Sequence, residues 1–212
     1  MNRAFDFLAA GYDQWYEAPE GSAVFREEVE CLSQLRKPGP GAWLEVGVGT
    51  GRFAGALGIT VGIDTSPRML EFAAMRGVNA IAAEAENLPF PAESFEGVLM
   101  ALSFCFIGNP RLALKECRRV LRPGGRLLLG IIPANSPWGQ EYTAKASRGH
   151  PIYSLAHFHT AGETVELARD AGFGLVGAAS GLLWKPGAQR RGSIETGIVQ
   201  EAGFIGLLFS PA

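Results

Sequence analysis

A glycine at every second position marks the part of the sequence that is best suited to bind a ligand. In the run LEVGVGTGRF (44–53), an apolar stretch is followed by Gly47, Gly49 and Gly51. Glycines leave room for the backbone to press against a ligand, and a helix that follows such a turn offers free N–H groups and the positive end of its dipole. The pattern is typical of the first strand-to-helix turn of a doubly wound α/β sheet, where such folds bind their ligands.

The spacing of these glycines argues against a dinucleotide as that ligand. The dinucleotide pattern is G-x-G-x-x-G/A, and Arg52 stands where its third glycine belongs. Glu45, just before the glycines, would repel a pyrophosphate but suits a ligand that carries an amino group. These features favour the methionine end of S-adenosylmethionine.

A second candidate for ligand binding is Asp64, which ends the apolar run VGID (61–64). A carboxylate at the end of the second strand typically accepts hydrogen bonds from both ribose hydroxyls of a nucleoside. Alternatively, Asp64 or Ser66 caps the helix that Pro67 opens. Its separation from the glycine turn favours the ribose role for Asp64.

The surrounding sequence alternates short apolar runs with helical patterns. The runs predict strands at 42–46, 59–63, 78–82, 97–102 and 126–132, and the patterns between them predict helices at 53–57, 67–76 and 110–121. This alternation indicates βαβ units in a mainly parallel sheet with helices on both faces.

Helices are also predicted on either side of this alternating region. An aromatic stripe from Phe5 to Trp15 predicts a first helix, and a second begins at Gly21–Ser22 with Ser22 as its N-cap and stops at KPGPG (37–41). Later, Thr160 and Glu163 form a capping box for a helix that ends near Gly172.

The chain is predicted to form a single domain. Apolar runs at 175–184 and 204–209 predict a closing strand pair, and the 133–160 stretch is long for a loop, which is often a sign of function. The parts are an N-terminal helical cap (1–40), a cofactor-binding core (41–132), an acceptor-side loop (133–160), and a C-terminal helix with a strand hairpin (161–212).

Charge and cysteine content exclude several classes of function. The formal net charge is -2, with 19 Lys and Arg against 21 Asp and Glu, so nothing indicates a nucleic-acid partner. Cys31, Cys105 and Cys117 lie far apart without a CxxC pair, which argues against a disulfide framework and a metal site. Without a signal peptide or a long apolar span, we expect a cytoplasmic protein with no membrane partner.

Four stretches together resemble a class I S-adenosylmethionine-dependent methyltransferase. They are LEVGVGTGRFA (44–54), VGIDTSPRML (61–70), AEAENLPFPAESFEGVLM (83–100) and ECRRVLRPGGRLLLG (116–130). The resemblance is to methyltransferase type 11, the branch that contains the ubiquinone and menaquinone biosynthesis methyltransferases. It implies a Rossmann-like, doubly wound, seven-stranded sheet that is mostly parallel, with an antiparallel last strand and helices on both faces. RPGG (122–125) would turn the chain into the fifth strand.

The resemblance also implies a cofactor and the residues that bind it. The cofactor is S-adenosyl-L-methionine, and the product formed from it is S-adenosyl-L-homocysteine. Glu84 stands where the family usually has Asp, and Glu86 has the alternative role of capping a local turn. The implied cofactor-binding residues are Tyr12 and Tyr16 in the N-terminal helix, Glu45, Gly47, Val48, Gly49 and Gly51 around the methionine, Asp64 at the ribose, Thr65, Ser66, Met69, Glu84, Ala85 and Glu86 around the adenine, and Ala101, Leu102 and Ser103 beside the sulfonium.

The predicted function is methyl transfer to a small-molecule acceptor by in-line displacement. The enzyme must align the reacting atoms and exclude water, and it needs a general base only if the acceptor loses a proton. Candidates for such a base are His157 and His159, in an aromatic-rich stretch. The alternatives are a non-catalytic protein that binds S-adenosylmethionine and an oxidoreductase with a nucleotide cofactor. No oligomeric state is predicted.

Overall fold

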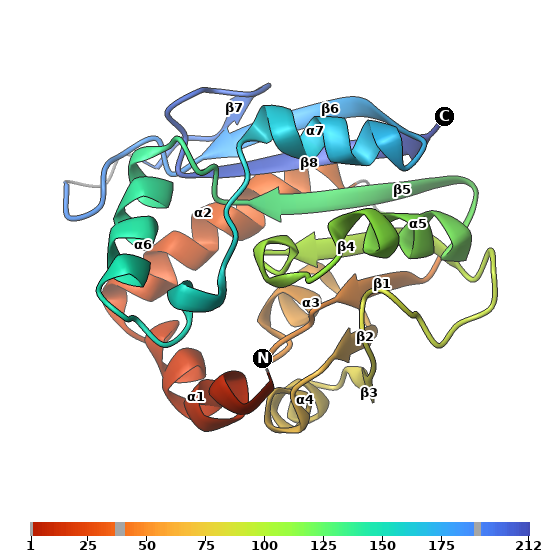
Figure 1. Ribbon diagram of the computed structural model, residues 1–212, viewed down its shortest axis with the longest axis horizontal. Coiled ribbons are helices and arrows are strands. Elements are labelled where there is room, and N and C mark those ends of the chain that lie inside the picture. Colours follow the sequence, from red (N-terminus) through yellow and green to blue (C-terminus); the bar gives the residue numbers. More distant parts are fainter. Residues whose placement is uncertain (1, 37–40, 189–191) are drawn as a thin grey trace.

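The computed structural model describes residues 2–36, 41–188 and 192–212, which form one sheet of eight strands with helices on both faces (Figure 1). The strands are β1 (Trp43–Val46), β2 (Val61–Asp64), β3 (Asn79–Ala82), β4 (Phe95–Ala101), β5 (Leu121–Ile131), β6 (Phe173–Gly181), β7 (Glu195–Thr196) and β8 (Phe204–Pro211). The α-helices are α1 (Asn2–Trp15), α2 (Pro19–Leu35), α3 (Arg52–Leu57), α4 (Pro67–Met75), α5 (Pro110–Val120), α6 (Pro137–Ser147) and α7 (Ala161–Asp170), and the short 3₁₀ turns are η1 (Phe104–Phe106) and η2 (Tyr153–Leu155).

The sheet confirms the predicted α/β class and corrects the number of strands. Its order is β3-β2-β1-β4-β5-β8-β6-β7, in which β1 to β5 pair in parallel and β8 runs antiparallel to both neighbours. The strand beyond the predicted seven is β7, two residues in the polar insert after β6. It forms because the Gly197 N–H donates to the Ala178 carbonyl at 2.8 Å and the Ser180 hydroxyl donates to the Gly197 carbonyl at 2.8 Å.

The buried residues divide into two cores, one on each face of the sheet. Leu127 and Leu129 of β5 pack with α5 and α7, whereas Leu128 packs on the opposite face with α2, α3 and α4. This alternation follows from the two-residue period of a strand, and it makes the central strands continuous apolar runs. Figure 1 shows α1 and α6 at one end of the sheet, beyond the arrowheads of β4 and β5.

Several predicted boundaries differ from the observed ones, and two of the differences have a clear local cause. The second helix begins at Pro19 rather than after Ser22, because a proline fits the first turn of a helix, where no N–H partner is needed. The fifth strand begins at Leu121, which pairs with Phe95 before RPGG interrupts the register, and the ladder resumes where Arg126 lies opposite Gly97. Most of the predicted stop signal, residues 37–40, lies outside the described residues.

The predicted loop at 133–160 contains a helix that the sequence analysis missed. Ser136 caps α6, its hydroxyl accepting a hydrogen bond from the Gly139 N–H at 3.0 Å, and Pro137 occupies the first turn. The same pairing of a cap with a proline opens α4 at Ser66 and α5 at Asn109. The capping box of α7 is present as predicted. Within the described ranges, no helix combines the length and apolar character that a bilayer crossing requires.

Candidate active site

The glycine turn is fixed against the ends of two neighbouring strands. The N–H groups of Gly47 and Val48 both donate to the Ile63 carbonyl, at 2.9 and 2.8 Å. A Cβ on Gly47 would lie 2.4 Å from the Cβ of Ser103, so only glycine allows this approach. Gly49, at φ +52°, faces open space instead. The turn is therefore closed toward β4 and open at Gly49.

Two other residues of the turn have a structural role. Gly51 caps α3 at φ 80°, and a Cβ there would lie 2.8 Å from the Cα of Ala73 in α4. Val48 is buried, and its side chain lies where Gly62 would carry a Cβ. These two predicted residues pack the turn against the helices and β2, rather than bordering a cavity.

Asp64 connects the glycine turn with the start of α4. One carboxylate oxygen accepts a hydrogen bond from the Gly49 N–H and the other from the Ser66 N–H, both at 2.9 Å. Burial raises the pKa of Asp64, and these backbone donors counteract part of the shift. Ser66, rather than Asp64, is the N-cap of α4, because its hydroxyl accepts from the Met69 N–H at 3.2 Å.

A small cavity of about 120 Å³ opens beside Gly49 and Asp64. The glycine turn and Asp64 both border this cavity, because the carboxyl ends of β1, β2 and β4 meet at one edge of the sheet. The predicted residues that border it are Tyr12, Gly47, Gly49, Asp64, Thr65, Met69, Ala85, Glu86, Ala101, Leu102 and Ser103, joined by the unpredicted Phe5, Phe106 and Ile107.

The three acidic residues predicted near the cofactor differ in their burial and in whether they border a cavity. Glu45 is 1% exposed and borders neither cavity, and its Oε2 has no hydrogen-bond partner among the described residues. Burial raises the pKa of Glu45 well above its usual value, although a hydrogen bond from the Ala54 N–H opposes this. Glu84 is exposed, away from the cavities. Glu86 accepts from the Asn109 N–H at 2.9 Å, so it also fastens the start of α5.

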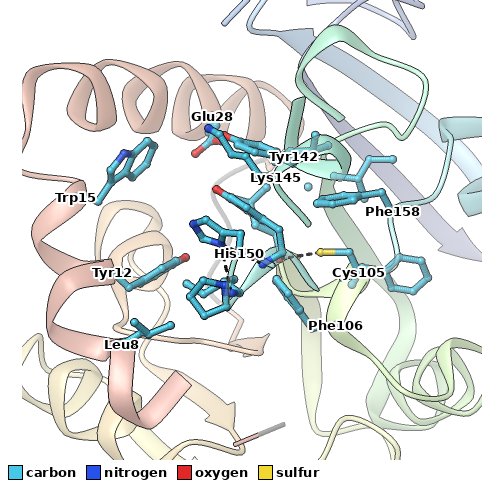
Figure 2. Close-up of a pocket in the computed structure, with 18 of the residues that line it drawn as sticks. Leu8, Tyr12, Trp15, Glu28, Cys105, Phe106, Tyr142, Lys145, His150 and Phe158 are labelled. Carbon is cyan, nitrogen blue, oxygen red and sulfur yellow. Dashed lines mark hydrogen bonds between the residues drawn. The ribbon is translucent and has the colours of Figure 1, made fainter. Parts of the chain in front are cut away.

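A larger cavity of about 480 Å³ adjoins the small one, in the size range of small-molecule sites (Figure 2). The two cavities share Tyr12, Leu102 and Phe106. Leu102 directly follows β4 at φ 57°, a left-handed conformation that is uncommon for a leucine and is often found at functional sites. The aromatic residues that border the large cavity are Tyr12, Trp15, Tyr16, Phe104, Phe106, Tyr142, Tyr153 and Phe158.

The tyrosines of the large cavity lie in two pairs. The hydroxyls of Tyr12 and Tyr16 are hydrogen-bonded at 2.9 Å, and the stacked rings of Tyr142 and Tyr153 have centroids 4.4 Å apart. Burial raises the pKa of Tyr153 to about 12 and also raises those of the other three. These hydroxyls are therefore protonated at neutral pH.

The two predicted histidine candidates are separated by the structure. His159 borders the large cavity, and burial followed by the neighbouring His157 lowers its pKa, so it is neutral at neutral pH. His157 is exposed and borders neither cavity. His150, which the sequence analysis did not select, also borders the large cavity, with its Nδ1 accepting from the Ile152 N–H at 3.3 Å. Burial raises the pKa of the Cys105 thiol to about 12, as expected for an inert filler.

A pair of buried glutamates on α2 was not predicted from the sequence. Glu27 accepts hydrogen bonds from the Leu182 N–H and the Trp184 indole, both at 3.2 Å. Glu28 is 2% exposed and borders the large cavity, and its Oε2 has no hydrogen-bond partner among the described residues. Burial raises the pKa of Glu28 to about 8, and the charge of Glu27 adds to the shift. Val24, Glu28 and Leu32 follow at four-residue intervals, a spacing that could have placed Glu28 on the buried face.

Helix α1 covers both cavities and is attached to the core by two aspartates. Asp13 accepts hydrogen bonds from Arg52 and Arg76, each at 2.9 Å, and Asp6 accepts from the Ser66 hydroxyl. Arg52 is the residue that replaces the third glycine of a dinucleotide turn, and here it holds α1. Although burial alone would raise it, the two arginines lower the pKa of Asp13 below its usual value.

Comparisons with known proteins show the family to which the chain belongs. A family model described as a methyltransferase domain matches residues 44–129. An uncharacterized protein of Mycobacterium tuberculosis is 40% identical over 201 residues, 94% of this chain and 70% of that protein. The crystal structure of a SAM-dependent methyltransferase of Thermotoga maritima, described as a possible histamine N-methyltransferase, has a TM-score of 0.92 at 32% identity and covers 100% of both chains. A demethylmenaquinone methyltransferase of the same organism is 33% identical over 144 residues, 63% of this chain and 62% of that enzyme.

The chain belongs to the S-adenosylmethionine-dependent methyltransferases. Its cofactor is S-adenosylmethionine, and S-adenosylhomocysteine is the product formed from it. The family resemblance seen in the sequence is confirmed, and an oxidoreductase is not supported. The open space at Gly49 and the Asp64 carboxylate beside it fit this cofactor, since they offer a close backbone approach and a hydrogen-bond acceptor at one cavity.

The attachment of α1 predicts an effect of Asp13→Ala on cofactor binding. Without this carboxylate, Arg52 and Arg76 lose their shared partner, and α1 covers the small cavity less tightly. We expect S-adenosylhomocysteine to bind roughly tenfold more weakly in calorimetric titration, about 1.4 kcal/mol. Glu71→Ala is the matched control, because it removes the exposed ion pair with Arg68 on α4. Equal affinities for wild type and Asp13→Ala would contradict this role for α1.

The buried carboxyl of Glu28 predicts a pH-dependent stability difference for Glu28→Gln. The pKa of Glu28 is raised from 4.5 to about 8 by folding, so its contribution to stability is fully present below pH 4.5 and is lost as the pH rises through about 8. The Tm of Glu28→Gln should therefore exceed that of wild type by an amount that grows as the pH rises across this range. The corresponding change in the free energy of unfolding is on the order of a few kcal/mol. The exposed Glu30→Gln on the same helix serves as control. A gain that is constant with pH would refute the shift.

Proposed function

We propose that this protein transfers the methyl group of S-adenosylmethionine to a small-molecule acceptor by in-line displacement. The observation that carries this proposal is the arrangement of the two cavities, which share Tyr12, Leu102 and Phe106. One cavity borders the glycine turn, and the other has the volume and the aromatic walls of a small-molecule site. Reacting groups that meet at this boundary would be held in line and away from water.

The small cavity supplies the residues that would hold the cofactor. Asp64 is the proposed acceptor for the ribose hydroxyls, and Thr65 and Met69 lie beside the position proposed for the adenine. The backbone at Gly47 and Gly49 would contact the methionine part, while the Glu45 carboxyl, buried beneath the turn and outside the cavity, would favour its ammonium group once ionised. When bound, S-adenosylmethionine supplies a methyl carbon that its sulfonium activates toward nucleophiles.

The other predicted cofactor residues are proposed to support these contacts. Ser66 and Gly51 fix the starts of α4 and α3, and Val48 packs the turn against β2. The Ala85 N–H is the proposed donor to an adenine ring nitrogen, since Ala85 borders the cavity. Glu84 is exposed, which favours Glu86 as the acidic residue nearer to the base.

One of the two predicted general-base candidates borders the large cavity. If the acceptor loses a proton, His159 is the proposed general base, because it borders this cavity with a lowered pKa, whereas His157 does not border it. Residues 1–40 are proposed as the cap over the site, 41–132 as the cofactor-binding core, 133–160 as the acceptor side, and 161–212 as the closing helix and strands of a single domain.

Transfer of a methyl label tests the proposed acceptor class. The protein is incubated with S-adenosylmethionine labelled in its methyl group and with small metabolites, RNA or protein fractions prepared from cells. We expect the label in a small molecule. Label in RNA or protein alone would overturn the acceptor class, and cofactor binding without transfer to any fraction would indicate a non-catalytic protein. With a chiral methyl group, in-line displacement requires inversion, and retention would exclude it.

The ribose assignment predicts that Asp64→Ala weakens binding of S-adenosylhomocysteine. Losing one or two hydrogen bonds to a buried carboxylate costs about 1–3 kcal/mol, which calorimetric titration measures directly. Because Asp64 also holds the Gly49 N–H, Gly49→Val provides a second variant that puts a branched side chain into the open space without removing the carboxylate. We expect that variant to bind no ligand. Unchanged affinity of Asp64→Ala, with folding verified by circular dichroism, would exclude the ribose role.

A further inference from the structure

The large cavity contains a buried carboxylate that the methyl-transfer chemistry leaves unexplained. Glu28 is 2% exposed, it borders this cavity, and its Oε2 has no hydrogen-bond partner among the described residues. Its neighbour Glu27, equally buried, receives hydrogen bonds from the Leu182 backbone and the Trp184 indole. One glutamate therefore has a structural role in the chain, and the other is oriented into a space large enough for a ligand.

The hydroxyl groups around Glu28 do not compensate its charge. Tyr12 and Tyr16 are hydrogen-bonded to each other, and the rings of Tyr142 and Tyr153 are stacked on each other. Burial raises the pKa of all four hydroxyls, and the charge of the nearby Glu28 adds to each shift. None of them donates a hydrogen bond to the Glu28 Oε2. These tyrosines therefore contribute aromatic surface to a ligand that binds next to Glu28.

The cationic side chains in this part of the structure have other partners. Lys145 is the one lysine or arginine that borders the large cavity among the described residues, and its ammonium lies 3.6 Å from Glu141 and 5.3 Å from the Tyr142 ring centre. Arg52 lies over the Tyr16 ring and binds Asp13. Across the described ranges, no ion pair within 4.0 Å forms at Glu28.

A buried carboxylate without a partner costs several kcal/mol, so Glu28 holds a proton near neutral pH while its pKa is raised to about 8. A cation that binds beside it would displace this proton and stabilise the charged form. Tyrosine and tryptophan rings add cation–π attraction to a desolvated ammonium group. A neutral ligand gains nothing from the charged form, and an anionic ligand is repelled by it. Glu28 together with Tyr12, Trp15 and Tyr142 thus has the composition of a site for an organic cation.

We propose that the large cavity selects an acceptor that is a small organic cation, with its protonated nitrogen bound by Glu28 and its apolar body held between the aromatic side chains. This inference rests on the proposed function, because it assigns the acceptor to this cavity. Figure 2 shows Glu28 at the opposite end of the cavity from Phe106, which borders both cavities. Glu28 therefore binds the acceptor at the end remote from the methyl group and leaves the other end to react.

The test compares three probes of similar shape and different charge, namely phenethylamine, phenethyl alcohol and 3-phenylpropionate. Each is titrated near neutral pH into the protein saturated with S-adenosylhomocysteine. We expect the amine to bind roughly tenfold or more tightly than the alcohol, and the carboxylate to bind weakest. Glu28→Gln should remove most of this preference and leave the affinity for the alcohol unchanged, whereas the exposed Glu30→Gln should behave as wild type.

Lys145→Met provides a second discriminating variant. If Glu28 binds the ammonium group of the ligand, removing the positive charge of Lys145 should leave the affinity for the amine equal or higher. Loss of amine binding in Lys145→Met would show that the cation site needs Lys145 and would overturn the assignment to Glu28 alone. Equal binding of amine and alcohol, tighter binding of 3-phenylpropionate, no binding of any probe at millimolar concentration, or an unchanged preference in Glu28→Gln would each overturn the proposal. Failure of S-adenosylhomocysteine to bind would instead refute the proposed function itself.

Discussion

The structure depends on how the carboxyl ends of three strands are tied together without filling the space beside them. The Ser103 hydroxyl donates to the Val46 carbonyl at 2.7 Å, which links the ends of β4 and β1, while the Ile63 carbonyl of β2 receives two N–H groups from the glycine turn. Buried backbone groups must be paired, and here they are paired within the turn. Because the residues at the closest approach are glycines, the same turn leaves open space at Gly49 beside Asp64.

The position of α1 follows from a different kind of interaction. A helix of 14 residues is marginal by itself in water, so its place depends on contacts with the core. Asp13 and Asp6 provide these contacts. Asp13 binds Arg52 of α3 and Arg76, which follows α4, and Asp6 binds Ser66, the N-cap of α4. Since α1 carries Tyr12, these polar contacts with α3 and α4 place an aromatic side chain at the boundary of the two cavities.

The sequence predicted the parts of the fold that depend on local patterns. Apolar runs and N-caps located β1 to β5 and helices α4, α5 and α7, and the glycine turn with Asp64 identified the small cavity. Helix α6 was missed even though Ser136 and Pro137 repeat the start signal of α4, because the whole 133–160 stretch was interpreted as one long loop. Glu45 and Glu84 could not be placed from sequence, since only the path of the chain decides whether a carboxylate is covered or exposed.

The large cavity was the least predictable part, because its walls come from α1, α2, α6 and the chain after β4, which are distant in sequence. Glu28 illustrates this point. A pair of glutamates within a helix is usually solvent-exposed, and only the packing of α2 against β6 and β8 buries both. Tyr142 and His150 likewise reach the cavity only because α6 and η2 fold back toward α1.

Glu27 explains how the structure keeps Glu28 buried although the Oε2 of Glu28 has no hydrogen-bond partner among the described residues. Consecutive residues of a helix point about 100° apart, so a rotation of α2 that carried Glu28 out to solvent would also withdraw Glu27 from the Leu182 N–H and the Trp184 indole. Those groups would then be left without their partner at a cost of about 1–3 kcal/mol each. The bonded glutamate therefore holds the helix in the orientation that keeps the unbonded one buried. A site fixed in this way loses little freedom when a ligand arrives, which is the condition for selective binding by a single charge.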